Sequence, residues 1–180
     1  MNRSLPSRRS IRLQGYDYSS EGLYFVTICT QDMKCLFGKV IDGDMVLNDA
    51  GRKVLETYKE LENKFMNVYC WEVIVMPNHF HAIIELHDNV GTDLCVCPIK
   101  NKGEHIGSPL PDIVRWFKTM TTNYYIQGVK SEGWIPFNRK LWQRNYYEHI
   151  IRNSTSYQNI ADYIRSNPVN WATDNYYVNL

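Results

Sequence analysis

Runs of hydrophobic residues divide the chain into segments that have the periods of strands and helices. Residues 23–30, with the sequence LYFVTICT, are rich in β-branched and aromatic side chains, which is typical of a strand. Residues 68–76 and 80–86 have the same character, and the turn residues Pro77 and Asn78 separate them. The pattern therefore predicts three core strands, of which the last two follow one another through a tight turn.

Apolar positions spaced three and four residues apart predict three helices. These run from Asn48 or Asp49 to about residue 63, from Asp112 to about residue 127, and from near Ser154 to residue 167. We expect Gly128 to close the second helix and Pro168 to stop the third. Residues 34–47 predict a small hairpin, and 141–152 have only a weak pattern. The order of these elements predicts an α+β domain, an antiparallel sheet with its helices on one face.

The composition is that of one globular domain. The chain has 180 residues, 44% of them hydrophobic and 22% charged, which is enough to bury a core. No apolar run reaches 18 residues and no signal peptide precedes the first strand, so we expect a cytoplasmic protein without a membrane span. We divide the chain into a basic arm at 1–15 and a single domain at 16–180.

The basic arm carries Arg3, Arg8, Arg9 and Arg12 and no acidic residue. The net charge of the whole chain is only +1, so total charge does not indicate a nucleic-acid partner. The local cluster suits contact with phosphates. An arm that only adds solubility accounts for the same residues equally well.

The cysteines and the common catalytic motifs narrow the possible functions. The chain has five cysteines and no CxxC pair, which argues against a disulfide framework and a zinc ribbon. Cys95 and Cys97, with His87 and His105 nearby, leave a soft-metal site as a lesser alternative to two unrelated loop thiols. The phosphate-binding loop, the HExxH helix and the G-x-S-x-G elbow are all absent from the sequence.

His79 and His81 form the first candidate chemical motif. Residues two apart on a strand point to the same face, so both imidazoles face one side while Phe80 enters the core. Two coplanar imidazoles about 7 Å apart along a strand can hold one divalent metal ion. A structural or solvated histidine pair is the simpler interpretation when this motif is taken alone.

Tyr163 and Asn167 form the second candidate motif. They lie four residues apart on the last predicted helix and therefore share a face. A tyrosine beside an amide oxygen can serve as a nucleophile next to a metal ligand. Tyr163 could also be a core residue, and Asn167 could be only the end of the helix before Pro168.

Basic and aromatic residues in the second half form a third candidate, a path for phosphates and unpaired bases. The basic members are Arg115, Lys118, Arg139, Lys140, Arg144, Arg152 and Arg165, and the aromatic ones are Trp142, Tyr146 and Tyr147. A solvated charged surface explains any single member as well. His149 could contact DNA, assist proton transfer, or pack structurally.

Two longer segments carry a resemblance to a known family. VIVMPNHFHAII at 73–84 resembles the metal-binding segment of the single-tyrosine HUH transposases, which move insertion sequences as single strands. LWQRNYYEHIIRN at 141–153, followed by DYIRSNPVNW at 162–171, resembles the branch of REP-associated tyrosine transposases. The segment at 8–31 is similar to that branch as well, so the resemblance covers most of the chain.

This resemblance implies a ferredoxin-like antiparallel sheet with the histidine pair on a central strand and the nucleophile Tyr163 on a C-terminal helix. It implies that His79 and His81 bind Mg²⁺ or Mn²⁺. In the wider group a Gln four residues after the tyrosine completes the metal site, and here that position is Asn167, whose side chain is one methylene shorter. The implied substrate is single-stranded DNA with a hairpin. We expect Arg8, Arg9, Arg12, Arg115, Lys118, Arg144, His149 and Arg152 to contact it.

The implied activity is a metal-dependent nicking and strand-transfer reaction through a 5′-phosphotyrosine. A hairpin-binding protein of the same fold that does not cleave is the main alternative. A metal-dependent phosphodiesterase that uses water would not need Tyr163. A replication initiator or relaxase is a fourth reading, but the chain is short and its C-terminal motif differs. The sequence leaves open a monomer or a homodimer.

Overall fold

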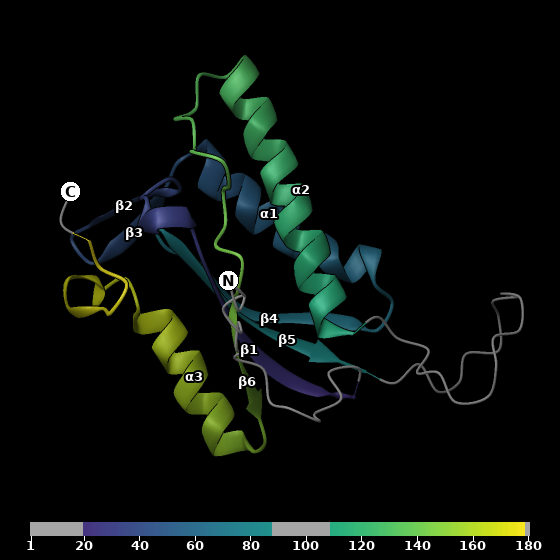
Figure 1. Ribbon diagram of the computed structural model, residues 1–180. Helices are drawn as coiled ribbons and strands as arrows, with labels where there is room; N and C mark the ends of the chain where they lie inside the picture. Colours follow the sequence, from purple (N-terminus) through teal and green to yellow (C-terminus); the bar gives the residue numbers. More distant parts are fainter. Residues whose placement is uncertain (1–19, 88–108, 179–180) are drawn as a thin grey trace, which may run out of the picture.

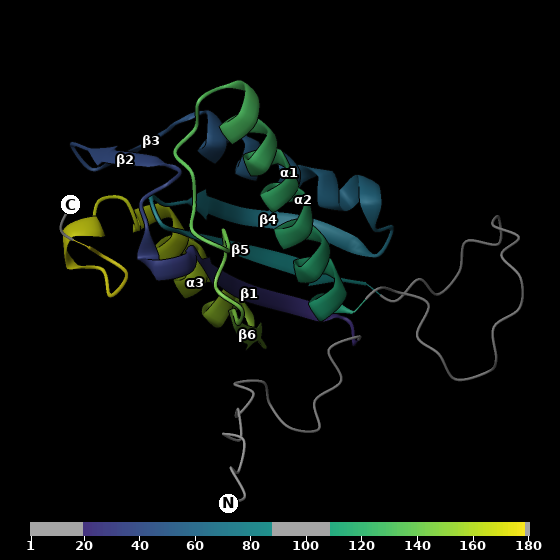
Figure 2. The same ribbon diagram turned by 45° about the horizontal axis from the view of Figure 1, so that its top comes forward.

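A four-stranded antiparallel sheet forms the centre of the protein, in a computed structural model that describes residues 20–87 and 109–178 (Figure 1). The strands are β1 (Gly22–Cys29), β4 (Val68–Val75), β5 (His79–Leu86) and β6 (Tyr147–Ile151). Their order across the sheet is β4-β5-β1-β6, so β1 and β5 are interior and β6 is an edge (Figure 2). The three strands expected from the hydrophobic runs are confirmed, and the weak segment at 141–152 supplies the fourth.

A separate hairpin precedes the first long helix. Strands β2 (Gly38–Ile41) and β3 (Asp44–Leu47) pair with each other in a two-stranded sheet, as expected. Asp42 and Gly43 form the turn, and their φ angles are 52° and 85°. Asp-Gly tolerates these left-handed angles, which match the twist of a tight hairpin.

The three helices lie on both faces of the sheet. Helices α1 (Asp49–Lys64) and α2 (Leu110–Ser131) cover one face, and α3 (Ser154–Ser166) covers the other (Figures 1 and 2). The expectation that all helices share one face was therefore wrong. Strands β1 and β5 are buried along nearly their whole length on both faces, and only helices on both sides can exclude water from them.

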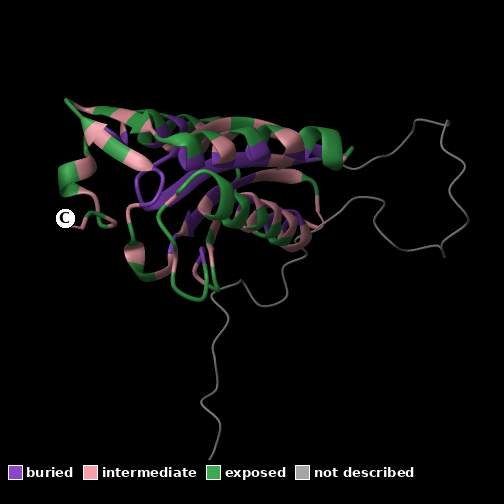
Figure 3. Ribbon diagram, turned by 90° about the horizontal axis from the view of Figure 1, so that it is seen from above, coloured by how far each residue is buried: buried purple, intermediate pink, exposed green. Residues whose placement is uncertain are grey.

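Two apolar clusters follow from this arrangement, and Figure 3 shows that buried residues are concentrated in the sheet. The larger one lies between the sheet and α1 and α2, and it includes Tyr58, Phe80 and Phe117. The smaller one lies under α3, where Phe25 and Ile83 of the sheet meet helix residues. Consecutive residues of β5 thus enter different clusters, because successive side chains of a strand point to opposite faces of the sheet.

Helix α2 is longer than expected. It passes through Gly128 and ends at Ser131, so the expected closure at the glycine was wrong. A Cβ at position 128 would lie 2.2 Å from the ring of Trp134. The glycine is therefore required by close packing against that ring rather than by a helix end. Among the helices described, none is long and apolar enough to cross a membrane.

Candidate metal and nucleophile site

Strand β5 presents His79 and His81 to the face of the sheet that α3 covers. Both imidazoles are at most 1% exposed, and Phe80 between them is in the opposite core, as predicted. The two ring centroids are 4.5 Å apart and the rings are inclined by 68°. The expected coplanar arrangement was therefore wrong, because the two side chains turn toward each other at the end of the strand.

Asn78 fixes the orientation of His79. Its amide nitrogen donates to the carbonyl oxygens of Met33 and Tyr176, which places its side-chain oxygen toward the imidazole. Nδ1 of His79 lies 2.9 Å from that oxygen, and because the oxygen can only accept, Nδ1 must carry the proton. The Nε2 atom of His79 therefore has a free lone pair, the state in which an imidazole binds a metal.

His81 connects the sheet to the tyrosine of α3. Its Nδ1 lies 2.7 Å from the hydroxyl of Thr27, and its Nε2 lies 3.3 Å from the hydroxyl of Tyr163. A phenol that donates to Nε2 requires the proton of His81 on Nδ1. The ring of Phe25 stacks on His81 at 5.3 Å and meets the ring of Tyr163 edge-on at 6.1 Å. Sheet and helix thus hold the imidazole of His81 and the phenol of Tyr163 in contact.

Asn167, at the end of α3, completes the set. It is 1% exposed, and its amide nitrogen donates to Asp174 at 2.8 Å. The same asparagine acts on the pKa of His79, so its side chain lies next to that imidazole. Among the described residues, neither the side-chain oxygen of Asn167 nor Nε2 of His79 has a hydrogen-bond partner, although both are buried. Buried polar atoms without partners are costly, so two of them in one place indicate a site for a ligand.

Burial keeps both histidines neutral. It lowers the pKa of His79 to about 4, although Asp174 and Asn167 act in the opposite direction. Burial also lowers the pKa of His81 well below its ordinary value, and the neighbouring His79 adds to this effect. Neutral imidazoles at physiological pH are the form that a cation requires.

The residues present fit a divalent cation held by two imidazoles and an amide oxygen. In the described part of the chain, no three His, Cys, Asp or Glu side chains gather in a metal-binding group, so a carboxylate-rich site is not the arrangement found here. The candidate ligand atoms are Nε2 of His79, Nε2 of His81 and the side-chain oxygen of Asn167. The first and the last of these are buried and have no hydrogen-bond partner among the described residues. Imidazole nitrogens and amide oxygens are common ligands of divalent metals.

Tyr163 lies beside His81, but the surroundings of its hydroxyl disfavour the phenolate form. Its side chain is 41% exposed, so its hydroxyl is accessible from one side. Burial, followed by the charges of Asp174 and Tyr176, raises the pKa of Tyr163 to about 12. The phenol of Tyr163 is therefore protonated at physiological pH. A positive charge beside the phenol would lower this pKa.

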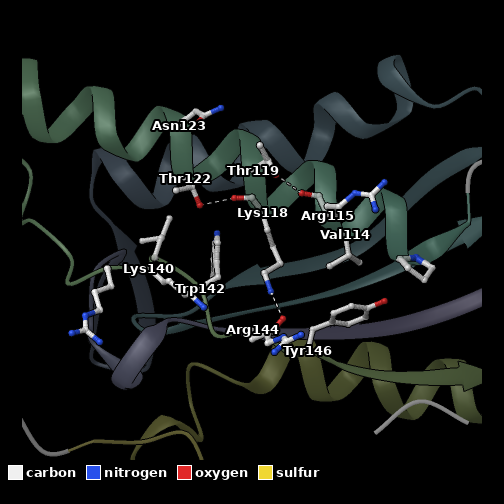
Figure 4. A pocket seen from close by; sticks show the side chains of 13 residues that line it. Val114, Arg115, Lys118, Thr119, Thr122, Asn123, Lys140, Trp142, Arg144 and Tyr146 are labelled. Carbon is white, nitrogen blue, oxygen red and sulfur yellow. Dashed lines mark hydrogen bonds between the residues drawn. The ribbon is translucent and has the colours of Figure 1, made fainter. Parts of the chain in front are cut away.

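A basic pocket lies on the other side of the sheet, against α2. It has a volume of about 570 Å³, and Figure 4 shows its side chains. Three predicted DNA-contacting residues line it, Arg115, Lys118 and Arg144, together with Arg139 and Lys140. The Nζ atom of Lys118 donates to the backbone oxygens of Gln143 and Arg144 at 2.6 Å and 3.0 Å, respectively. Burial, and then the charge of Lys140, lowers the pKa of Lys118 to about 8.

The remaining predicted contacts are dispersed. His149 lies on the face of the sheet that α3 covers, in a groove that Tyr147 also lines. Arg152 is exposed just after β6 and lines neither this groove nor the basic pocket. Arg165 pairs with Glu72 and Asp162, so it does not line the basic pocket. Trp142 is 4% exposed, and its indole nitrogen donates to Thr121, so it is a core residue rather than a stacking surface. Arg8, Arg9 and Arg12 lie outside the described residues.

Four residues of the site were not expected from the sequence. Asn78 was assigned only to a turn, and Thr27, Asp174 and Tyr176 were not singled out. Tyr176 lies over the histidines, with its ring centroid 4.7 Å from that of His79. Asn78 directly precedes the first histidine, a signal that could have been used. The others reach the site only through strand pairing and the return of the C-terminal segment.

Comparisons with known proteins relate this chain to REP-associated tyrosine transposases. Over 98% of its length the chain is 40% identical to an uncharacterized protein of Haemophilus influenzae, and the match covers 97% of that protein. A candidate REP-associated tyrosine transposase of the same species is 27% identical over 85% of this chain and 73% of its own length. The chain matches no protein-family model.

A solved structure gives the same fold. The structure of a REP-associated tyrosine transposase bound to a REP hairpin matches 90% of this chain and 73% of its own, with a TM-score of 0.57. The two sequences are 18% identical, so the likeness is one of fold. Both the antiparallel sheet and the accompanying helices are therefore shared.

Proposed function

We propose that this chain, which is distantly homologous to a REP-associated tyrosine transposase, cuts and transfers single-stranded DNA through a covalent bond to Tyr163. One observation carries the proposal. The Tyr163 hydroxyl lies 3.3 Å from Nε2 of His81, beside two buried atoms that have lone pairs and no described partner. The element order β1-α1-β4-β5-α2-β6 with sheet order β4-β5-β1-β6 supports a ferredoxin-like assignment.

His79, His81 and Asn167 would hold Mg²⁺ or Mn²⁺. The bound ion would supply positive charge next to a non-bridging oxygen of the scissile phosphate and next to the phenol. Asn78 and Thr27 keep the imidazoles in orientation, and Asp174 fixes the amide group of Asn167. Each proposed ligand thus has a partner that orients it, as is usual in metal sites.

The reaction then follows from the position of Tyr163. Its oxygen attacks the phosphorus in line, the phenol proton is lost to solvent, and the bond from phosphorus to the 3′ oxygen breaks. The 3′ oxygen takes up a proton and leaves as a hydroxyl, while the 5′ phosphate stays on the tyrosine. The bond energy is conserved in the ester, so attack by the 3′ hydroxyl of another strand rejoins DNA without ATP.

The basic pocket against α2 is the proposed site for the hairpin. The related transposase of known structure is bound to a REP hairpin, which supports a hairpin substrate here. Arg115, Lys118 and Arg144 come from a rigid helix and an adjacent segment, so they can fix the register of a duplex through its phosphates.

A protein that binds hairpins without cutting them is the second candidate. Tyr176 favours it, because its ring lies 4.7 Å from the ring of His79 and 5.8 Å from that of His81. A ring in this position restricts the space that a scissile phosphate needs. DNA binding at the basic pocket would not be affected.

The test is an assay for covalent protein–DNA adducts. Labelled single-stranded hairpins with flanking sequence are incubated with the protein and Mn²⁺ or Mg²⁺, and adducts are separated on a denaturing gel. We expect a metal-dependent adduct that is lost in Tyr163→Phe and kept in Tyr69→Phe, which changes an exposed tyrosine of β4. Hairpin binding without an adduct under either metal would favour the second candidate. Cleavage that persists in Tyr163→Phe would indicate water or another tyrosine.

A further inference from the structure

A second groove lies beside the Tyr163 site, on the face of the sheet that α3 covers. It lies between β6 and the first half of α3 and has a volume of about 570 Å³. The side chains that matter here are Phe25, Tyr147, His149, Asn153, Asn159 and Ile160. Neither the proposed metal ligands nor the basic pocket account for this groove.

The groove is continuous with the proposed cleavage site through Phe25. One side of this ring stacks on His81 at 5.3 Å, and its edges meet Tyr163 at 6.1 Å and Tyr147 at 6.3 Å. Phe25 is 8% exposed and is the shared floor of both sites. A strand whose phosphate lies at Tyr163 therefore has its neighbouring nucleotide over this floor.

The lining of the groove suits an unpaired nucleotide. The side chain of Tyr147 is 51% exposed, so a flat aromatic surface is available for a base. His149, Asn153 and Asn159 are exposed and offer N–H donors for phosphate or base edges. The oxygen of Asn153 accepts from the backbone of Ser156, which directs its amide nitrogen away from the helix.

The position of Tyr147 also relates the groove to the basic pocket. Tyr146 lines the basic pocket on one face of the sheet, and Tyr147 lines this groove on the other. Consecutive side chains alternate across a strand, and β6 is an edge of the sheet. DNA held in the basic pocket can therefore reach Tyr163 by passing over β6, with no other strand of residues 20–87 and 109–178 in the way.

We propose that the groove between β6 and α3 binds the single-stranded nucleotide next to the scissile phosphate, with its base stacked on Tyr147 and its polar edges facing His149 and Asn159. The assignment rests on the proposed function and names the site through which its single-stranded substrate passes. Stacking on one aromatic ring tolerates any base, so the groove holds the strand without reading its sequence. Discrimination among sequences then falls to the hairpin.

The test measures the binding of a fluorescein-labelled oligothymidylate about ten nucleotides long, by fluorescence anisotropy. Loss of the Tyr147 ring in Tyr147→Ala is expected to weaken binding roughly tenfold, and Tyr147→Phe should bind within about twofold of wild type. Tyr69→Ala is the matched control, because Tyr69 is 53% exposed and lies on β4 opposite Glu85, far along the sheet from the histidines. It should bind like wild type.

Each outcome of the binding assay either supports or overturns the assignment of the groove. Binding by Tyr147→Ala equal to wild type, or an equal loss in Tyr69→Ala, would overturn the assignment, and so would a wild-type protein that does not bind oligothymidylate. The adduct assay is run in parallel to separate the two proposals. A loss confined to Tyr147→Ala together with no wild-type adduct keeps the groove and rejects Tyr163 chemistry, whereas an adduct with no effect of Tyr147 does the reverse.

Discussion

The hydroxyl of Tyr163 lies 3.3 Å from Nε2 of His81, although 82 residues separate the two in the chain. The contact joins the last helix to an interior strand, and it exists only when α3 packs on that face of the sheet. The ring of Phe25 contacts the rings of both His81 and Tyr163. The proposed nucleophile is therefore positioned by the folded core, before any DNA binds.

Metal binding should stabilise the folded protein through His79. A cation bound only by the folded state at about one hundred times its Kd adds about 2.7 kcal/mol to the free energy of unfolding. For a domain of this size that corresponds to a rise in Tm of about 5–10 °C. We expect Mn²⁺ to produce such a rise in wild type and none in His79→Ala, as measured by differential scanning calorimetry.

The control for this experiment is His87→Ala, which removes a half-exposed imidazole outside the site. It should keep the metal-induced rise, and chelation should reverse it. An equal rise in His79→Ala would mean that the ion binds elsewhere.

Hairpin binding should weaken as pH rises through about 8, because Lys118 has a lowered pKa of about 8 and loses its charge there. The variant Lys118→Met is expected to bind roughly tenfold more weakly at pH 7 and to lack this step. Between pH 8 and the ordinary lysine value of 10.5, the unfolded chain binds more protons than the folded one. The contribution of Lys118 to the free energy of unfolding therefore rises with pH in that window.

Anisotropy titrations with a labelled hairpin at several pH values test this prediction. A wild-type affinity that is constant from pH 7 to 9.5, or an equal decline in Lys118→Met, would show that another group is responsible.

Glu72 should hold α3, and with it Tyr163, on the sheet. Its carboxylate accepts from the hydroxyl of Tyr157 at 2.7 Å and from Arg165, two residues on the same helix. Glu72 is mostly buried but Arg165 is half exposed, so we expect Glu72→Ala to lower the free energy of unfolding by only about 1–2 kcal/mol. Cleavage should slow while hairpin affinity stays unchanged.

Urea denaturation and single-turnover cleavage measure these two effects. Glu56→Ala is the control, since Glu56 pairs with Lys53 on an exposed surface and should change stability by less than about 0.5 kcal/mol. An equal loss of unfolding free energy in the two variants, or a Glu72→Ala protein that cleaves at the normal rate, would show that Glu72 does not hold α3 in place.

Local patterns predicted most of the elements but not how they are stacked. The hydrophobic runs at 23–30 and 68–86 gave their strands because they concentrate β-branched and aromatic residues and turn residues bound them. The side of the sheet that α3 covers depends on burial of both faces of β1 and β5, which a list of apolar residues does not separate. The end of α2 was misplaced because Gly128 packs against Trp134, a contact that no local signal carries.

The site shows the same division. His79 and His81 could be predicted to share a face because the period of a strand is two, and Tyr163 and Asn167 because a helix returns after four residues. That these pairs meet came from the family resemblance, not from spacing. Asp174 could not be predicted, because its role is to turn the amide of Asn167 through a tertiary hydrogen bond.

The most direct test of the account is to identify the residue that carries DNA. Adducts formed with a labelled hairpin and Mn²⁺ are digested with trypsin and nuclease, and the modified peptide is sequenced by tandem mass spectrometry. The expected peptide, residues 153–165, contains both Tyr157 and Tyr163, so fragment ions must distinguish the two. The expected modification is a nucleotide 5′-phosphate on Tyr163. Modification of Tyr157, Tyr176 or any other residue would contradict it.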